Sequence, residues 1–321
     1  MQVFQTQYQP IDRPIEDRIA VAQPRVLTDN RTVVGVFDGH GGPYTAEYLS
    51  QHLLSEILEA IPPHSLHDIV PEKLQAIFDA FDAKILSNVT ENFRFSLKVP
   101  VERIRQNLIS KKLCQGGIRD AVERAKSGAT ALVAYVEEAM LYLANTGDCR
   151  AVMGRLENDG SMSAHQLTDD LNAKNPLERA RLMAKQEEFA IVGERVLGQM
   201  EVTRSFGDAF FKLKNTNYTR QVFGHPLMTP KGKMSMHETH SHLYPHIISP
   251  PYLIPTPVTS TYPLSDAEVF LVLASDGLWD TAGVSNAWVV ETVDHGLRTG
   301  QNDVAQFLLD RVKEIARPGD D

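Results

Sequence analysis

The chain has 321 residues, of which 42% are hydrophobic and 23% charged, as is ordinary for a globular protein. Its formal net charge of −9 argues against a general nucleic-acid-binding protein, which would carry a basic stripe. The chain has no run of about 18 apolar residues, so no membrane span is predicted. Its two cysteines lack Cys-x-x-Cys spacing, which excludes a disulfide framework and a thiolate zinc site.

The predicted elements alternate between short strands and long helices. The first five residues indicate a strand that begins at once, and residues 33–37 form a second β-rich run that ends at an Asp-Gly turn signal. Apolar residues then recur near the 3.6-residue period over residues 44–61 and 71–89, which predicts two helices. The first of these helices stops before a Pro-Pro pair.

The elements that follow complete an α+β pattern. Residues 129–136 and 140–145 predict a hairpin, and a helix opens at Asn175-Pro176 with proline in its first position. Residues 269–274 predict a buried strand, and a terminal helix follows. Strand groups separated by helices, rather than a regular βαβ alternation, favour helices that cover sheets packed on each other.

We expect a single domain over residues 1–321, with a long irregular insertion at about 212–263. The insertion is rich in proline and has few periodic apolar positions. Its histidines include His237, His240, His242 and His246. Their spacing suits a transition metal, but loop histidines without supporting acids are more often solvated.

Four acidic positions share one local pattern, in which an acid at the end of an apolar run lies beside glycine or another acid. They are Glu16-Asp17, Asp38-Gly39, Asp276-Gly277 and Asp320-Asp321. Strand ends gathered at one edge of a sheet would place these carboxylates in a single cleft. Carboxylate oxygens are the ligands that hard cations such as Mg and Mn prefer, and a bridging carboxylate could hold two ions about 3.5–4 Å apart, as in phosphate-ester hydrolases.

The run Asp38-Gly39-His40-Gly41-Gly42 leaves two interpretations open. An Asp-Gly pair after a strand is more often a hairpin turn than a ligand. Three glycines within four residues, however, let the backbone pass close to a bound group. The other acidic positions in the same chain favour the second interpretation.

Six short motifs follow one another along the chain. They lie at residues 14–18 (Pro-Ile-Glu-Asp-Arg), 38–42 (Asp-Gly-His-Gly-Gly), 127–131 (Ser-Gly-Ala-Thr-Ala), 144–150 (Ala-Asn-Thr-Gly-Asp-Cys-Arg), 203–208 (Thr-Arg-Ser-Phe-Gly-Asp) and 274–280 (Ala-Ser-Asp-Gly-Leu-Trp-Asp). In these motifs the sequence resembles the metal-dependent protein phosphatase family, type 2C. The resemblance implies an α+β fold, a four-layer α-β-β-α sandwich with two antiparallel sheets flanked by helices. The family normally continues into a final core strand, which we expect to be missing after residue 321.

The resemblance also implies a site for two divalent cations, Mg or Mn. Its ligands would be Glu16, Asp17, Asp38, Gly39, Asp148, Asp276 and Asp320. Asp38 would bridge the ions, and the Gly39 carbonyl would ligate one of them. Asp276 and Asp320 would hold the other ion, with the Glu-Asp pair acting directly or through water. The family links the position of Asp148 to a third, weaker ion.

His40 is the residue that the resemblance implies as general acid, beside the catalytic Asp38. Imidazole suits this role because its unperturbed pKa lies near neutrality. Many relatives carry a phosphate-binding arginine four residues before the glutamate, where this chain has Asp12. Arg13, one residue later, is the nearest candidate for binding phosphate.

A closer likeness is to the pyruvate dehydrogenase phosphatase branch of the family. Three features carry this likeness: the form Pro-Ile-Glu-Asp-Arg, Lys212 after the Ser-Phe-Gly-Asp run, and residues 250–253 (Pro-Pro-Tyr-Leu). This likeness indicates the subgroup. It makes a pyruvate dehydrogenase-like protein one candidate substrate, without identifying the substrate. We expect an intracellular protein, either mitochondrial or cytoplasmic; no presequence is visible, so the mitochondrial alternative follows from this likeness alone.

Three functions follow from these observations. The first is a protein serine/threonine phosphatase that hydrolyses phosphoserine and phosphothreonine in phosphoprotein substrates with a metal-activated water. The second is a non-catalytic, phosphatase-like module that binds proteins. The third is a two-metal phosphoesterase acting on small molecules. We expect no nucleic-acid partner and no membrane span, and the oligomeric state stays open.

Overall fold

The computed structural model describes residues 2–8, 15–26, 29–91, 124–214 and 246–316. Its strands are β1 (Arg18–Ala22), β2 (Thr32–Phe37), β3 (Gly39–His40), β4 (Gly128–Ala129), β5 (Ala131–Glu137), β6 (Met140–Thr146), β7 (Arg150–Leu156), β8 (Met162–Gln166), β9 (Ile191–Val192), β10 (Arg195–Val196), β11 (Phe206–Gly207), β12 (Val258–Pro263) and β13 (Glu268–Ala274). Its helices are α1 (Tyr44–Ala60), α2 (Ile69–Glu91), α5 (Pro176–Met183), α6 (Ala209–Lys212), α8 (Asp276–Trp279), α9 (Asn286–Arg298) and α10 (Val304–Ile315).

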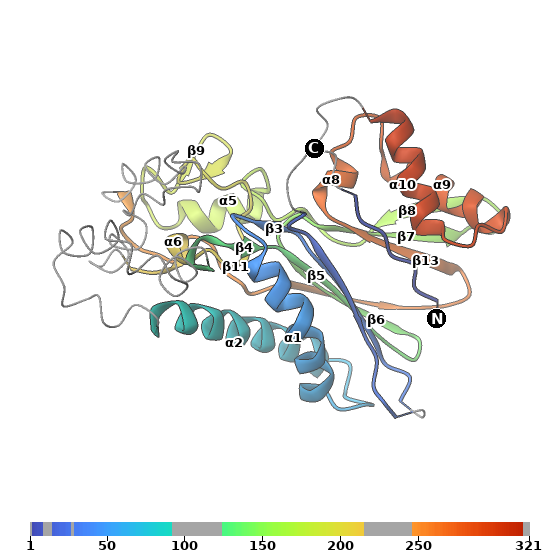
Figure 1. The fold of residues 1–321 in the computed structure, drawn as a ribbon, viewed down its shortest axis with the longest axis horizontal. Coiled ribbons are helices and arrows are strands. Elements are labelled where there is room, and N and C mark those ends of the chain that lie inside the picture. Colours follow the sequence, from blue (N-terminus) through green and yellow to red (C-terminus); the bar gives the residue numbers. More distant parts are fainter. Residues whose placement is uncertain (1, 9–14, 27–28, 92–123, 215–245, 317–321) are drawn as a thin grey trace, which may run out of the picture.

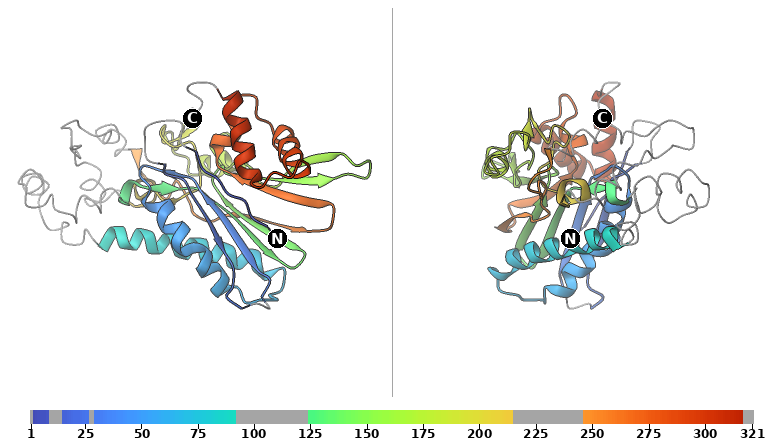
Figure 2. Two further views of the ribbon diagram at one scale, coloured as in Figure 1. Left: turned by 45° about the vertical axis from the view of Figure 1, so that its right-hand side comes forward. Right: turned by 90° about the vertical axis from the view of Figure 1, so that its left-hand side faces the viewer.

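Two antiparallel sheets form the centre of the fold (Figure 1). The first has five strands in the order β1-β2-β5-β6-β12, and the second has three in the order β13-β7-β8. Helices α1 and α2 lie against the outer face of the first sheet, and α9 and α10 lie over the outer face of the second (Figures 1 and 2). This arrangement confirms the predicted α+β class, with helices on both sides of two packed sheets.

Apolar side chains fill the spaces between these layers, and β5 shows how the sequence achieves it. Successive side chains of a strand point to opposite faces. Val133 and Tyr135 therefore pack toward α1 and α2, while Leu132 and Ala134 pack toward the second sheet. All four are buried. A strand that is covered on both faces is continuously apolar rather than alternating.

The long helices follow from their apolar periodicity. Helix α1 buries Leu49, Leu53 and Ile57, whose spacing of four residues puts them on one face. The helices predicted at 44–61 and 71–89 are observed as α1 and α2 with ends that differ by two residues or fewer. Strands β5 and β6 form the predicted hairpin, whose register pairs Glu137 with Met140 beside the turn.

The prediction of a strand at the N-terminus was wrong. Residues 2–8 make no strand pairing in the structure and lie against α10 instead. Thr6 Oγ1 donates a hydrogen bond to Gln306 Oε1 at 2.9 Å, and Lys313 Nζ lies 4.4 Å from the centre of the Tyr8 ring. Side-chain contacts with a helix thus hold this segment, and its backbone forms no ladder of hydrogen bonds with any strand of the described residues.

The predicted insertion extends too far toward the C-terminus. Residues 258–263 form β12, which pairs with β6 along its whole length and becomes the edge of the first sheet. His246, predicted to be a solvated loop residue, has its ring centre 3.9 Å from that of Phe189. His237, His240 and His242 lie outside the described residues.

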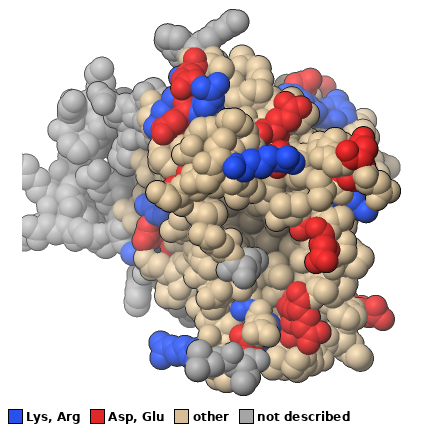
Figure 3. Space-filling view, turned by 90° about the vertical axis from the view of Figure 1, so that its right-hand side faces the viewer, with Lys and Arg blue, Asp and Glu red and all other residues tan. Residues whose placement is uncertain are grey.

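None of the helices in the described part of the chain combines the length and apolar character of a membrane span. On the face drawn in Figure 3, acidic and basic side chains are interspersed. Among the described residues on that face, no continuous basic stripe of the kind that binds nucleic acid is visible.

The layer between the two sheets supplies a test of the packing. Leu143 on β6 is fully buried there, whereas Leu177 on α5 is 79% exposed. We expect Leu143→Ala to lower the free energy of unfolding by about 3 kcal/mol, because the substitution leaves a cavity between the sheets. Leu177→Ala, the matched control, should change it by less than about 0.5 kcal/mol. Urea unfolding followed by circular dichroism measures both, and equal effects would contradict the layer assignment.

Candidate functional site

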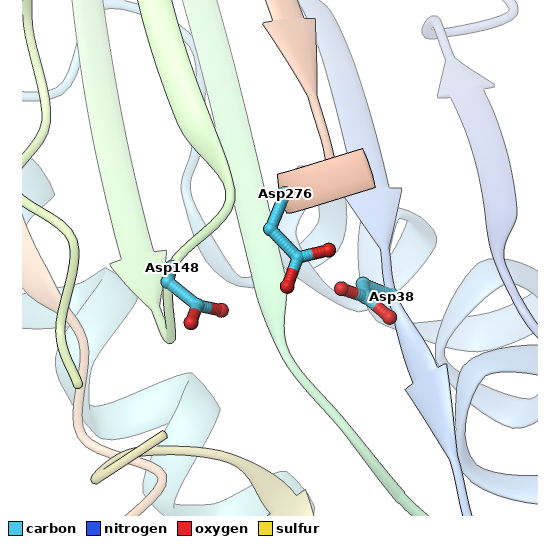
Figure 4. A group of neighbouring side chains, drawn as sticks. All are labelled: Asp38, Asp148 and Asp276. Carbon is cyan, nitrogen blue, oxygen red and sulfur yellow. The ribbon is translucent and has the colours of Figure 1, made fainter. Parts of the chain in front are cut away.

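Three carboxylates meet at one end of the sandwich. Asp38 follows β2, Asp148 lies in the turn between β6 and β7, and Asp276 is the first residue of α8, directly after β13 and Ser275. Figure 4 shows the three side chains pointing toward one another. Each offers an oxygen atom, and these oxygens all lie within 4.8 Å of one another. The ends of strands from both sheets therefore build a single acidic site, as the sequence predicts for Asp38 and Asp276.

The electrostatics of this site favour a bound cation. Burial, followed by repulsion from Asp17 and Asp276, raises the pKa of Asp38 well above its ordinary value. Burial and the charge of Asp276 raise the pKa of Asp148 to about 7. Burial and repulsion from Asp280 likewise raise the pKa of Asp276. Like charges this close disfavour one another's ionisation, and an opposite charge relieves that repulsion.

One oxygen of the cluster has an unmet hydrogen-bonding capacity. Asp148 Oδ1 is buried and has no hydrogen-bond partner among the described residues. Buried polar atoms are nearly always paired, so an unpaired carboxylate oxygen is consistent with an ionic partner. A set of carboxylate oxygens suits a hard divalent cation such as Mg²⁺ or Mn²⁺. The residues present therefore fit the predicted metal.

The Glu-Asp motif lies beside the cluster. Ser275 Oγ donates a hydrogen bond to Asp17 Oδ2 at 2.9 Å, which ties this segment to the turn before α8. A Cβ atom on Gly39 would lie 2.5 Å from the carbonyl oxygen of Glu16. Only glycine allows the two segments to pass so closely. The predicted metal ligand Asp320 and the candidate phosphate-binding residue Arg13 lie outside the described residues.

His40 lies next to the acidic cluster and is held by an acid that the sequence reasoning missed. Its Nε2 atom lies 3.0 and 2.9 Å from the two carboxylate oxygens of Asp208. Ser205 Oγ donates a further hydrogen bond to Asp208 Oδ2 at 2.5 Å. Burial alone would lower the pKa of His40, but the charge of Asp208 and its hydrogen bond outweigh burial and raise that pKa. The histidine is thus oriented and favoured in its protonated form.

A second missed residue is Gly128, which makes room for this pair. The small sheet β11-β4-β3 places Gly128 opposite His40 on one side and Gly207 on the other. A Cβ atom on Gly128 would lie 2.2 Å from Asp208 Oδ2 and 2.3 Å from His40 Nε2. The motifs at 127–131 and 203–208 contain both missed residues, but neither motif shows that its partner is the histidine.

The sequence of this chain matches a known protein family. The family model for protein phosphatase 2C matches residues 2–318. The human mitochondrial [pyruvate dehydrogenase [acetyl-transferring]]-phosphatase 2 is 30% identical in an alignment that covers 90% of this chain and 60% of the relative. The bovine mitochondrial [pyruvate dehydrogenase [acetyl-transferring]]-phosphatase 1 is also 30% identical, over 87% of this chain and 58% of its own. The chain thus spans about three-fifths of the length of these curated relatives.

Solved structures show the same fold. Serine-threonine phosphatase 2C from Toxoplasma gondii superposes with a TM-score of 0.58 at 16% identity and covers 94% of this chain and 84% of that one. A C. elegans sex determining protein superposes with a TM-score of 0.56 at 18% identity, over 94% of this chain and 59% of that one. At such identities the likeness supports the fold alone.

The raised pKa values predict how stability depends on pH. The pKa of Asp148 is about 7 in the folded protein, against an ordinary value of 3.8. Between these values the folded state binds a proton that the unfolded state has released, so without a cation the free energy of unfolding falls as pH rises from 3.8 to about 7. Mn²⁺ should reduce this fall, because it binds the ionised carboxylates.

Urea unfolding at mildly acidic and mildly alkaline pH, with EDTA or with Mn²⁺, measures this effect. We expect Asp148→Asn to show a smaller fall in EDTA than the wild type, because it lacks one of the titrating groups. Stability that is independent of pH in EDTA for the wild type would contradict the electrostatic description of the cluster.

Proposed function

Because the chain belongs to the protein phosphatase 2C family, we propose that it is a metal-dependent protein serine/threonine phosphatase acting on phosphoserine and phosphothreonine in phosphoproteins. The observation that carries this proposal is the meeting of Asp38, Asp148 and Asp276 within 4.8 Å, beside a histidine held by Asp208. Such a site joins a cation-binding set of oxygens to a proton donor, and hydrolysis of a phosphate ester of serine or threonine needs both.

Members of this family depend on divalent cations, generally Mg or Mn, and the acidic cluster can hold such an ion. We propose two ions, with Asp38 as the bridging ligand and a third, weaker position at Asp148. The remaining proposed ligands are Glu16, Asp17, the Gly39 carbonyl, Asp276 and Asp320. When bound, such ions neutralise charge on the phosphoryl oxygens and lower the pKa of water.

His40 supplies the proton that the leaving group requires. An alkoxide of serine or threonine is a poor leaving group, so its oxygen must be protonated as the phosphorus–oxygen bond breaks. The pKa of His40 is raised, chiefly by Asp208 acting against burial, and this keeps the imidazole protonated at higher pH than an isolated histidine. Asp208 also orients the ring through its hydrogen bond with Nε2.

The two mitochondrial relatives named above support finer proposals about substrate and compartment. We propose a mitochondrial location, and a phosphorylated pyruvate dehydrogenase-like protein as one substrate among those to be tested. Fractionation of cells that express the full-length protein tests the first proposal. Dephosphorylation of phosphorylated pyruvate dehydrogenase, compared with unrelated phosphoproteins, tests the second.

The decisive test of the activity is phosphate release from a phosphothreonine peptide with and without Mn²⁺. We expect the wild type to be active only with the cation. Asp38→Asn should reduce activity by at least about 100-fold, the size of effect seen when electrostatic stabilisation of a transition state is removed. The control is Asp294→Asn on α9, which removes a carboxylate paired with Arg298 on a surface helix.

Each other outcome favours a different function. Equal activity of Asp38→Asn and the wild type would reject the bridging role of Asp38. A wild type that binds Mn²⁺ and phosphopeptide without turnover would instead be a non-catalytic binding module. Turnover of nucleotides but not of phosphopeptides would indicate a small-molecule phosphoesterase.

Gly128→Ala tests the contact between His40 and Asp208. The added methyl group would occupy space within 2.3 Å of both side chains, so it should separate them. We expect kcat for the phosphopeptide to fall by about 10- to 100-fold, because general acid catalysis is lost in part, while the affinity for Mn²⁺ measured by calorimetry is retained. Gly160→Ala is the control: a Cβ atom there meets nothing within 4 Å, so its only cost is that of a side chain at a φ of +83°, which should lower stability without changing kcat. An unchanged kcat in Gly128→Ala would refute the role of this contact.

A further inference from the structure

A buried ion pair contacts the loop that carries Asp208. Asp82 on α2 and Lys212 on α6 are 4% and 3% exposed, and Lys212 Nζ lies 2.8 Å from Asp82 Oδ2. The two residues are separated by 130 positions in the sequence. Neither belongs to the acidic cluster, and neither touches His40 among the contacts of the described residues. The mechanism proposed above assigns them no role.

Both partners of the pair also hold the backbone of the same loop. Asp82 Oδ1 accepts a hydrogen bond from the Gly207 N–H at 2.7 Å. Lys212 Nζ donates one to the Ser205 carbonyl oxygen at 2.6 Å. Asp208 follows immediately, so the pair fixes the backbone on which the carboxylate facing His40 is mounted.

The loop adopts a backbone conformation that needs such support. Gly207 and Asp208 both have positive φ, 72° and 50°. Two successive left-handed residues cost free energy, above all at Asp208, because it is not glycine. Contacts from outside the loop must therefore maintain the conformation, and Asp82 and Lys212 provide them from two different helices.

Stability alone does not account for an ion pair at this position. Removing two charges from water costs about as much as their attraction returns, so an apolar pair of similar volume would serve the core as well or better. Burial is indeed the largest influence on Asp82, and it raises the pKa of that carboxyl despite the neighbouring Lys212. What an apolar pair lacks is an acceptor for Gly207 N–H and a donor for the Ser205 carbonyl.

We propose that Asp82 and Lys212 are positioning residues that hold residues 205–208 in the conformation in which Asp208 orients His40. This proposal rests on the proposed phosphatase function for its catalytic consequence, and on the contacts above for its geometry. The path runs from the ion pair to Gly207 and Ser205, then to Asp208, and then to the histidine.

The consequence depends on the leaving group. Without a proton from His40, threonine would have to leave as a strongly basic alkoxide. The p-nitrophenolate anion is stable and can leave without protonation. A displaced His40 should therefore lower kcat for a phosphothreonine peptide much more than for p-nitrophenyl phosphate. KM and the affinity for Mn²⁺ should change little, because the carboxylate cluster is untouched.

The experiment compares both substrates in the double variant Asp82→Leu/Lys212→Met, which leaves no unpaired buried charge and removes both the acceptor for Gly207 N–H and the donor to the Ser205 carbonyl. We expect kcat for the phosphopeptide to fall by about 10- to 100-fold and kcat for p-nitrophenyl phosphate to fall far less. The matched control is Asp29→Leu/Arg31→Met, which removes another largely buried ion pair, with a 2.6 Å contact, whose arginine donates to the Leu58 carbonyl near the end of α1. It should lower the melting temperature without changing the ratio of the two activities.

A parallel fall of both activities, or no change in either, would overturn the proposal. If the double variant does not fold, Asp82→Asn/Lys212→Met is the milder pair: it leaves no unpaired charge, still removes the donor to the Ser205 carbonyl, and carries the same expectation and the same refuting result. A crystal structure of the variant gives a readout without any activity: the contact between His40 Nε2 and Asp208 should lengthen, and an unchanged contact overturns the proposal. Absence of turnover by the wild type with Mn²⁺ would reject the proposed function, and the crystal structure would still decide the positioning role.

Discussion

Repulsion among closely spaced carboxylates is the constraint on which the rest of this structure depends. Asp38, Asp148 and Asp276 bring oxygen atoms within 4.8 Å of one another in a site where Asp148 is buried and the other two are partly buried, and the pKa of each is raised. Such a group is unfavourable unless a proton or a cation compensates the charge. The fold holds the three residues together by taking each from the end of a different strand, so the packing of the whole sandwich opposes their separation.

The histidine beside the cluster must, in contrast, lie close to a carboxylate, that of Asp208. Its contact with Asp208 exists because Gly128 has no side chain to separate the two, and because the loop before α6 turns with two left-handed residues. The large sheets do not contribute directly to this contact. The small sheet β11-β4-β3 does, because it joins three segments from distant parts of the chain at hydrogen-bonding distance.

The sequence predicted the elements and candidate ligands that short local patterns determine. Helices α1 and α2 and the hairpin of β5 and β6 follow from periodicity within short windows, and the Asp-Gly motifs marked Asp38 and Asp276 as candidate ligands. Strand β12 was missed because its polar, half-exposed residues form a strand by pairing with β6, and that pairing is not visible in its own sequence. Asp208 was missed as the partner of His40 because 168 residues separate them and only the folded chain brings them together.

The acidic site lies where the two sheets meet, and this position links its occupancy to the integrity of the fold. Asp38 ends a strand of the first sheet, Asp276 follows a strand of the second, and Asp148 lies in the connection between them. A cation held by all three would join one sheet to the other, and a ligand that binds only the folded state lowers the population of opened molecules as its concentration rises. Opening of the sandwich exposes the apolar layer between the sheets to proteases. The supply of free cation would then set how long each molecule survives as well as how fast it works.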